Sequence, residues 1–416
     1  MLTWLTLSVR NLFRNGRRSA FTIVAIGLGF LAVNALGGFT AYIFTSLQDS
    51  YIYGEGNGHL TIFHAGFLGQ GKLDPVRYLL TEADLAALRK RLAAYPEVAL
   101  ATPGLHIAGM LSNGQVSTIF IGEGRVPADM ATIAQLSRDA IGQVRLYDGQ
   151  ALQDAHPYGI GVSRGLAQLL NVPLDGTAVA MAPTVSGQIN ALDVEVRQLI
   201  DAPVEALEDK LVSVPLRFAQ NLYDTTSADH LTLVLRDGSR TGAVAARLAA
   251  DFAAHGAAYE VRTWSQLSPF YVKVKKMFSV IFLITFLIVF TIVVMSVVNT
   301  VGMAVMERTR EIGTLRALGM KRRGIVLLFS LESLILGAFG SALGIALMLL
   351  VVLLIRLCEP TWVPPQITRA VPLQIYLVGQ YWLGSVLLLL LLSLLAAILP
   401  ARKAARMEIT YALGFS

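Results

Sequence analysis

The chain has 416 residues, of which 54% are hydrophobic and 15% are charged, and its formal net charge is +6. Its mean hydropathy is +0.59. This composition excludes an ordinary soluble protein and indicates that part of the chain lies in lipid. Because a helix needs roughly 20 consecutive apolar residues to cross a bilayer, we searched for such runs and found four. We therefore predict an α-helical membrane protein with four transmembrane helices and a large α+β periplasmic domain between helices 1 and 2.

The predicted segments follow one another along the chain. They are a cytoplasmic amphipathic segment at 1–18, transmembrane helix 1 with a stalk at 19–48, the periplasmic domain at 49–272, a stalk with transmembrane helix 2 at 273–305, a cytoplasmic amphipathic helix at 306–324, transmembrane helix 3 at 325–357, a periplasmic loop at 358–376, transmembrane helix 4 at 377–400 and a cytoplasmic tail at 401–416. The first apolar run is too long for a cleavable signal, so we interpret it as a retained anchor.

The distribution of positive charge predicts the orientation, because loops rich in Lys and Arg stay in the cytoplasm. One side of the predicted spans carries Arg10, Arg14, Arg17, Arg18, Arg308, Arg310, Arg316, Lys321, Arg322, Arg323, Arg402, Lys403 and Arg406. The opposite flanks carry fewer, so both termini are expected in the cytoplasm. Residues 50–272 hold 16 Lys or Arg against 22 Asp or Glu. The basic pI therefore belongs to the membrane flanks, and nucleic-acid binding is not indicated.

The large domain shows strand and turn signals at short intervals. Thr81 and Asp84 have the spacing of a capping box, which predicts a helix up to about Ala94. Segments 105–110 and 115–121 flank an Asn-Gly turn and predict a hairpin. Further strands are expected at 178–182, 194–200 and 231–235, and a second helix at 241–252. We expect two subdomains divided near 129–150.

No phosphate-binding, zinc or redox motif is present. The sequence lacks the phosphate-binding pattern G-x-x-x-x-G-K-[ST], the zinc motif H-E-x-x-H and a C-x-x-C pair. His59 and His64 fall on opposite faces of a strand, so we interpret them as ordinary polar residues. The single Cys358 excludes an intramolecular disulfide. A membrane-tethered enzyme is therefore disfavoured.

The stretch between the second and third spans carries the most specific pattern. Ile312, Leu315 and Leu318 recur at three-residue spacing and predict an apolar stripe on a short helix, and Gly319 suits its end. The charges around the stripe belong to Glu307, Arg308, Arg310, Glu311 and Arg316. Such a helix can lie on lipid headgroups or dock onto a cytoplasmic partner. The mixed signs favour docking, because a lipid-bound helix would be more uniformly basic.

Two kinds of residue inside the spans bear on helix contacts. Gly337, Gly340 and Gly344 allow helices to approach closely, and packing within one copy is as plausible as contact between two copies. Asn34 and Asn299 are polar groups in lipid, which face a cavity or form hydrogen bonds between helices. Of these two alternatives, hydrogen bonding between helices is favoured.

The run ERTREIGTLRALGMKRRGI from Glu307 and the following LILGAFGSALGIAL resemble the permease domain shared by the macrolide exporter MacB, the lipoprotein-releasing Lol permeases and the division protein FtsX. The opening SVRNLFRNGRRSAFTIVAIGLG resembles the same family's amino terminus, and IAGMLSNGQVSTIFIGEG resembles its extracytoplasmic core. The layout is closest to the lipoprotein-releasing permeases.

The resemblance implies a transport subunit of a bacterial inner membrane, not an enzyme. Two permeases, either identical copies or paralogues, would sit on a cytoplasmic ABC ATPase dimer, which binds the ATP as a separate polypeptide. The segment from Glu307 to Gly319 would couple ATP hydrolysis to the periplasmic domain, and thereby extract or export a lipoprotein or other amphiphile from the outer leaflet. A periplasmic carrier or adaptor is a further implied partner. The alternative is an FtsX-like regulator that activates a periplasmic protein.

Overall fold

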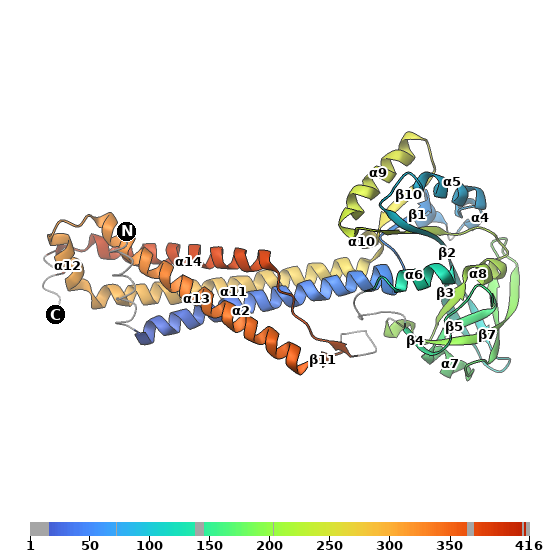
Figure 1. Cartoon of the computed structure of the whole chain (residues 1–416), viewed down its shortest axis with the longest axis horizontal. Helices are drawn as coiled ribbons and strands as arrows, with labels where there is room; N and C mark the ends of the chain where they lie inside the picture. The colour runs from blue at the N-terminus through green and yellow to red at the C-terminus, as the bar shows by residue number, and fades with distance from the viewer. Residues whose placement is uncertain are drawn as a thin grey trace. The chain divides into compact units, whose positions relative to one another are not determined.

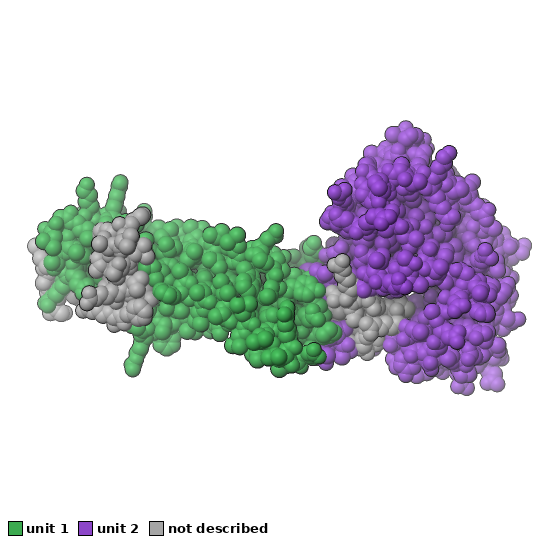
Figure 2. Space-filling view, in the orientation of Figure 1, with its two compact units in different colours: residues 1–43, 274–360, 372–416 green, residues 44–273, 361–371 purple. Residues whose placement is uncertain are grey.

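The computed structural model describes residues 16–71, 73–137, 145–202, 204–363, 370–409 and 412. The chain forms two compact units, which Figure 2 shows in different colours. The membrane unit comprises residues 1–43, 274–360 and 372–416, and the sheet domain comprises residues 44–273 and 361–371. The amphipathic segment predicted at 1–18 lies outside the described residues except for its last three.

Four long helices build the membrane unit (Figure 1). They are α2 (Gly16–Asp49), α11 (Pro269–Glu307), α13 (Arg322–Cys358) and α14 (Gly379–Arg406). Each is long and apolar enough to cross a bilayer, which confirms the predicted fold class. The helices are longer than the predicted apolar runs, and α11 reaches 39 residues. A bilayer needs only about 20, so α11 contains about twice the minimum.

Helices α2 and α13 approach closely at glycines. A Cβ atom added to Gly340 would lie 2.6 Å from Cβ of Ile26, and one added to Gly344 would lie 2.6 Å from Cβ of Phe30. No real side chain tolerates such distances, so these positions need glycine for backbone proximity. The contacts lie within one copy of the chain, which is the first of the two alternatives that the sequence left open for Gly340 and Gly344.

Helix α14 is joined to its neighbours by small and polar residues. A Cβ at Gly337 would lie 2.8 Å from Oγ of Ser393, so α13 and α14 also meet at a glycine. The buried Asn34 donates to the carbonyl of Phe30 at 2.9 Å and accepts from the hydroxyl of Ser385 at 3.4 Å. Asn34 therefore forms a hydrogen bond between α2 and α14.

Ten of the described strands form one mixed sheet, and β11 (Thr361–Trp362) and β12 (Val371–Pro372) form a separate two-stranded sheet. The strands of the mixed sheet are β1 (Leu60–His64), β2 (Val98–Ser112), β3 (Ser117–Arg125), β4 (Arg145–Gly149), β5 (Gly159–Ser163), β6 (Thr177–Pro183), β7 (Ile189–Asp201), β8 (Leu211–Pro215), β9 (His230–Leu235) and β10 (Tyr259–Thr263). The order is β10-β1-β9-β2-β3-β8-β5-β7-β4, with β6 paired to β2 and β7. The pairs β3–β8 and β5–β7 are parallel, and the others are antiparallel.

Short helices cover this sheet. They are α3 (Phe67–Gln70), α4 (Pro75–Tyr78), α5 (Glu82–Leu92), α6 (Pro127–Ala134), α7 (Arg164–Leu170), α8 (Leu216–Tyr223), α9 (Thr241–Ala254) and α10 (Trp264–Leu267). The predicted capping box is present at the start of α5, where Thr81 accepts from the backbone of Asp84 and Asp84 accepts in return. The predicted hairpin is also confirmed: Ser112 pairs with Ser117, and Gly114 in the turn has φ +88°.

Two hydrophobic cores lie in the sheet domain, but not where the sequence predicted a division. One core includes Phe120 and Val162, which lie on opposite sides of the predicted boundary at 129–150. The other is built from residues 60–95 and 228–252. The prediction was wrong because β3 and β5 both pair with β8, which holds the chain before and after 129–150 in one sheet.

The glycine contacts generate a prediction about stability. Gly340→Val should destabilise the membrane unit by about 1–3 kcal/mol, because overpacking forces α2 and α13 apart. Thermal unfolding of the purified protein in detergent would measure the loss. Gly302→Val in α11 is the matched control, since nothing lies within 4 Å of a Cβ there. Equal Tm values for the two variants would contradict a close α2–α13 contact.

Candidate functional site

The amphipathic segment predicted at 306–324 forms a short helix, α12 (Thr309–Ala317), between α11 and α13. The buried hydroxyl of Thr309 shares its one proton between the carbonyls of Val305 at 2.9 Å and Met306 at 3.0 Å. It thereby satisfies acceptors that the end of α11 leaves without partners in the helix. The chain therefore turns between α11 and α12 without leaving these carbonyls unpaired.

Gly319 ends the segment in a Schellman motif. Its φ is +94°, its N–H donates to the carbonyl of Arg316 at 3.0 Å, and the N–H of Met320 donates to the carbonyl of Leu315 at 3.0 Å. A left-handed residue at this position is most often glycine because a Cβ is strained there. The motif directs the chain into α13 at Arg322.

The apolar stripe predicted for docking does not form one surface. Ile312 is only 3% exposed and belongs to the core of the membrane unit, and Leu315 is partly buried against that core. Leu318, by contrast, is 80% exposed. The prediction was wrong for Ile312 and Leu315 because their own chain supplies the burial, through residues of α11, α13 and α14.

Two predicted coupling charges also bind within the chain. Arg308 donates to Glu311 at 2.8 Å and to Glu332 of α13 at 2.9 Å, and the Arg308 and Glu332 side chains are 15% and 11% exposed. Burial by itself would lower the pKa of Arg308, but the two carboxylates outweigh it and raise the pKa. Arg308 is therefore a bracing residue between α12 and α13.

The remaining predicted charges connect the same end of the membrane unit. Arg18 near the start of α2 pairs with Glu307 at 2.8 Å. The guanidinium of Arg316 donates to the carbonyl of Met407, directly after α14. The start of α2, the segment α12 and the end of α14 therefore lie at one end of the unit, as an even number of spans requires.

One face of α12 stays exposed. It consists of Arg310, Thr314, Ala317 and Leu318, which we call the outer face of α12. Their spacing of four, three and one residues places them on one side of a helix. Three exposed cations follow it, Lys321, Arg322 and Arg323. The face thus combines one exposed leucine with a basic surround.

The sequence analysis did not identify Glu332 as a site residue, and it did not decide between two roles for Asn299. Glu332 lies inside the apolar run of α13 and is 8% exposed. A carboxylate in such a run needs a partner, and this signal could have identified it. Asn299 is exposed on α11 and is not enclosed by the helices of its own copy.

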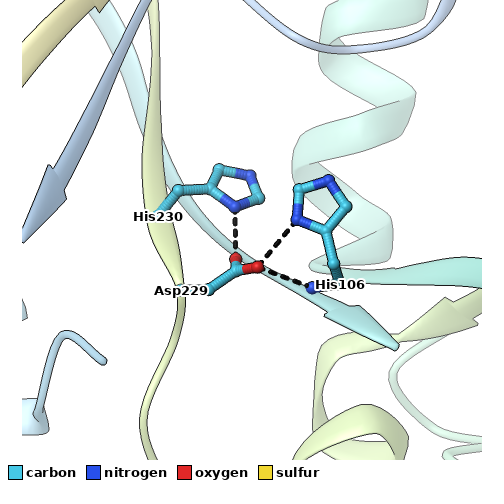
Figure 3. A group of neighbouring side chains, drawn as sticks. All are labelled: His106, Asp229 and His230. Atoms are coloured by element: carbon cyan, nitrogen blue, oxygen red, sulfur yellow. Dashed lines mark hydrogen bonds and ion pairs between the residues drawn. The ribbon is translucent and has the colours of Figure 1, made fainter. Parts of the chain in front are cut away.

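The sheet domain holds a second polar cluster, shown in Figure 3. Nδ1 of His106 on β2 lies 2.7 Å from Oδ2 of Asp229, and Nδ1 of His230 on β9 contacts Oδ1 of the same carboxylate. The backbone N–H of His106 also donates to Asp229, at 3.1 Å. Asp229 and His230 are adjacent in sequence, but His106 lies 123 residues before Asp229, so no spacing motif indicates the cluster.

Glu123 and Arg125 of β3 extend this cluster. Glu123 Oε1 lies 3.1 Å from Nε2 of His230, and Oε2 lies 2.6 Å from Arg125. Burial lowers the pKa of His230, but Asp229 and Glu123 more than offset this and raise it to about 9. Burial would raise the pKa of Asp229, yet the two histidines hold it below its usual range. The two carboxylates therefore favour the protonated, positively charged form of His230.

The two histidines that the sequence drew attention to are separate from this cluster. His59 is buried and accepts from the N–H of Leu235 at 3.1 Å. Burial lowers the pKa of His59 to about 4. His64 is the last residue of β1. His59 thus has a structural hydrogen bond of the ordinary kind that the sequence suggested.

Comparison with known proteins bears on the membrane unit. Residues 277–409, which include α12 and its bracing contacts, match the family described as FtsX-like permease C-terminal. The membrane unit of the chain therefore contains an FtsX-like permease domain. This confirms the resemblance on which the sequence interpretation rested. Its four apolar helices make the permease a multi-pass membrane protein.

Relatives of this permease include larger proteins. It is 28% identical over 210 residues to the macrolide export ATP-binding/permease protein MacB of Hyphomonas neptunium, covering 50% of this chain and 30% of that protein. It is 28% identical over 153 residues to MacB of Escherichia coli, covering 36% and 22%. The chain thus spans less than a third of the length of these relatives. Among solved structures, the periplasmic region of MacB from Actinobacillus actinomycetemcomitans matches with 14% identity, 51% and 92% coverage and a TM-score of 0.36.

The buried ion pair of the permease gives a second prediction. Glu332→Gln should lower stability by up to about 3–5 kcal/mol, because it leaves the Arg308 guanidinium buried with one carboxylate fewer. Glu307→Gln is the matched control, since its pair with Arg18 is 43% exposed on the Glu307 side and such pairs contribute about 0–1 kcal/mol. Thermal unfolding in detergent compares them. A Glu332→Gln protein as stable as Glu307→Gln would show that the pair does not brace α12.

Proposed function

We propose that the protein is the permease subunit of an ABC transporter in a bacterial inner membrane. A separate cytoplasmic ATPase dimer would bind and hydrolyse ATP, and the permease itself would hold no cofactor. The energy of ATP hydrolysis would drive the extraction or export of a lipoprotein or another amphiphile from the outer leaflet. The FtsX-like match over residues 277–409 supports the permease role. The names of the MacB relatives, which join an ATP-binding part to a permease, support the partnership with an ATPase.

The observation that carries the proposal is the outer face of α12. It is an exposed patch on a short helix whose opposite side is buried in its own chain through Ile312. A helix fixed on one side and exposed on the other can bind a partner without separating from the membrane helices. Leu318 would supply apolar burial to the ATPase, and Arg310 would supply a charge that sets the register.

The bracing contacts suggest how motion is passed on. Arg308 holds α12 to α13 through Glu332, and Thr309 holds it to the end of α11. A displacement of α12 by the ATPase would therefore move both spans. Because α11 continues unbroken from Pro269 to Glu307, the same movement would reach the sheet domain, where a periplasmic carrier or adaptor is a further proposed partner.

The exposed side of α11 supports a second permease in the complex. Ile288, Ile292, Met295, Asn299 and Met303 recur at spacings of three and four residues and are all exposed. Apolar side chains there suit lipid, but Asn299 does not, because a polar group in hydrocarbon is costly without a partner. A second copy, or a paralogue with a matching helix, would cover it.

The proposed orientation places both termini and α12 in the cytoplasm and the sheet domain outside. In a Cys358→Ala background, Gln115→Cys should react with a membrane-impermeant thiol reagent in intact spheroplasts, and Thr314→Cys should not. Both positions are exposed, so access to the reagent decides the labelling. After permeabilisation both should react, which is the control for Thr314. Labelling of Thr314 alone in intact cells would reverse the orientation.

The coupling proposal predicts the effect of changing the outer face of α12. The double variant Arg310→Glu, Leu318→Asp should lose the ATPase on co-purification in detergent, because burying a leucine contributes about 1.5–3 kcal/mol and the reversed charge repels. The variant itself should keep its Tm, since both side chains are exposed.

Ile312→Asp is the contrasting variant. It places a charge in the core of the membrane unit, so it should lower Tm as well as binding. Undiminished co-purification of the ATPase with the Arg310→Glu, Leu318→Asp protein would contradict docking at α12 and favour a helix that lies on lipid headgroups.

A further inference from the structure

We propose that the sheet domain binds a divalent transition-metal ion of the Zn²⁺ class through His106, His230 and Glu123, with Asp229 orienting the two imidazole rings. This site is independent of the coupling role of α12. Among the described residues, His106, Asp229 and His230 form a group whose possible ligand atoms lie within 4.8 Å of one another. Glu123 is not part of that group, and it is added to the proposed site because its carboxylate lies next to Nε2 of both histidines. Imidazole nitrogens with carboxylate oxygens are a common ligand set for Zn²⁺.

Asp229 determines which nitrogen of each ring is free. Its two oxygens contact Nδ1 of His106 and Nδ1 of His230. A carboxylate only accepts hydrogen bonds, so each ring in its neutral form carries its proton on Nδ1 and presents a lone pair on Nε2. Figure 3 shows the second nitrogen of each ring turned away from Asp229. A carboxylate that holds histidine ligands in this way is the usual outer shell of a zinc site.

Glu123 lies opposite these free nitrogens. Its Oε1 is 3.1 Å from Nε2 of His230, and its Oε2 is 3.7 Å from Nε2 of His106. Tetrahedral Zn²⁺ with bonds of about 2.0–2.2 Å places its ligand atoms about 3.3 Å apart. The distance from Oε1 to His230 is close to this value, and the distance from the other oxygen, Oε2, to His106 is longer. The His106 side chain is 61% exposed, so its ring has room to turn and an ion has a path to enter.

Oε1 of Glu123 is buried and lies 3.1 Å from Nε2 of His230. When His230 is protonated, these two atoms form an ion pair. A metal ion would take the place of the proton on Nε2, so we expect Zn²⁺ binding to release protons and to weaken as the pH falls.

Gly104 keeps the space beside these atoms open. A Cβ at this position would lie 2.4 Å from Nε2 of His230 and 2.8 Å from Oε1 of Glu123. The φ of Gly104 is not in the left-handed region, so backbone conformation does not demand glycine there. The missing side chain instead leaves room where the two proposed ligand atoms converge.

Arg125 reduces the negative charge of the proposed site and links it to the segment after α2. Its guanidinium lies 2.6 Å from Oε2 of Glu123 and opposes a second cation there, but the two carboxylates carry two negative charges against its one positive charge. Arg125 also donates to the carbonyl of Glu55 and to Oδ1 of Asn57, both at 2.8 Å. These residues follow directly after α2 and its π-helical extension Ser50–Gly54, so metal binding would act on the segment at the end of the first span.

The test uses the full-length protein in detergent after removal of metal with a chelator. Calorimetric titration with Zn²⁺ should show one ion bound per chain, and X-ray absorption should show two imidazole ligands. His106→Ala and Glu123→Gln should each weaken Zn²⁺ binding at least tenfold. His255→Ala is the matched control, because His255 is also exposed and also contacts a carboxylate, that of Asp251, and it should bind Zn²⁺ as the parent does.

Two results would overturn the proposal. One is the absence of stoichiometric Zn²⁺ binding by the parent protein. The other is equal Zn²⁺ affinity in all three variants, which would mean adventitious binding elsewhere. Size exclusion and thermal unfolding check that each variant is folded, and Glu123→Gln, which preserves the side-chain shape, keeps the test decisive if His106→Ala is unstable.

Discussion

The ion pair between Arg308 and Glu332 joins the turn after α11 to the interior of α13, and the rest of the membrane unit is arranged around it. A guanidinium and a carboxylate next to lipid are tolerated only when each neutralises the other. Their pairing fixes α12 against the bundle, which in turn buries Ile312 and leaves Leu318 outside. This ion pair and the apolar packing of Ile312 against α11, α13 and α14 together divide α12 into a buried and an exposed side.

Close helix contacts complete this arrangement. Gly340 and Gly344 bring α13 against α2, and Gly337 brings it against Ser393 of α14. Lipid provides no hydrophobic driving force between helices, so such contacts depend on backbone proximity and packing. Helix α11, in contrast, is the least buried of the four long helices within one copy of the chain. Because α11 is so exposed, its polar residue Asn299 is relevant to the proposed contact with a second permease.

In the sheet domain, the long strand β2 belongs to both cores. Its start pairs with β9 beside one core, and its end pairs with β3 and β6 beside the other. The cluster around Asp229 ties β2 to β9, and Glu123 adds β3. A local pattern such as the hairpin at Gly114 or the capping box at Thr81 was predictable, because neighbouring residues alone determine it. The boundary at 129–150 was not, because strand pairing across the chain decides where a core ends.

The sequence by itself determined the four spans and the helix break at Gly319, because lipid thickness and backbone conformation constrain residues close together in the chain. The run from Glu307 likewise indicated the FtsX-like permease domain. Only the tertiary structure decided that Ile312 is buried while Leu318 is exposed, that Glu332 pairs with Arg308, and that His106 meets His230. Each of these depends on contacts between segments far apart in sequence. Periodicity identifies an apolar face, but the rest of the fold determines whether the same chain or a partner covers it.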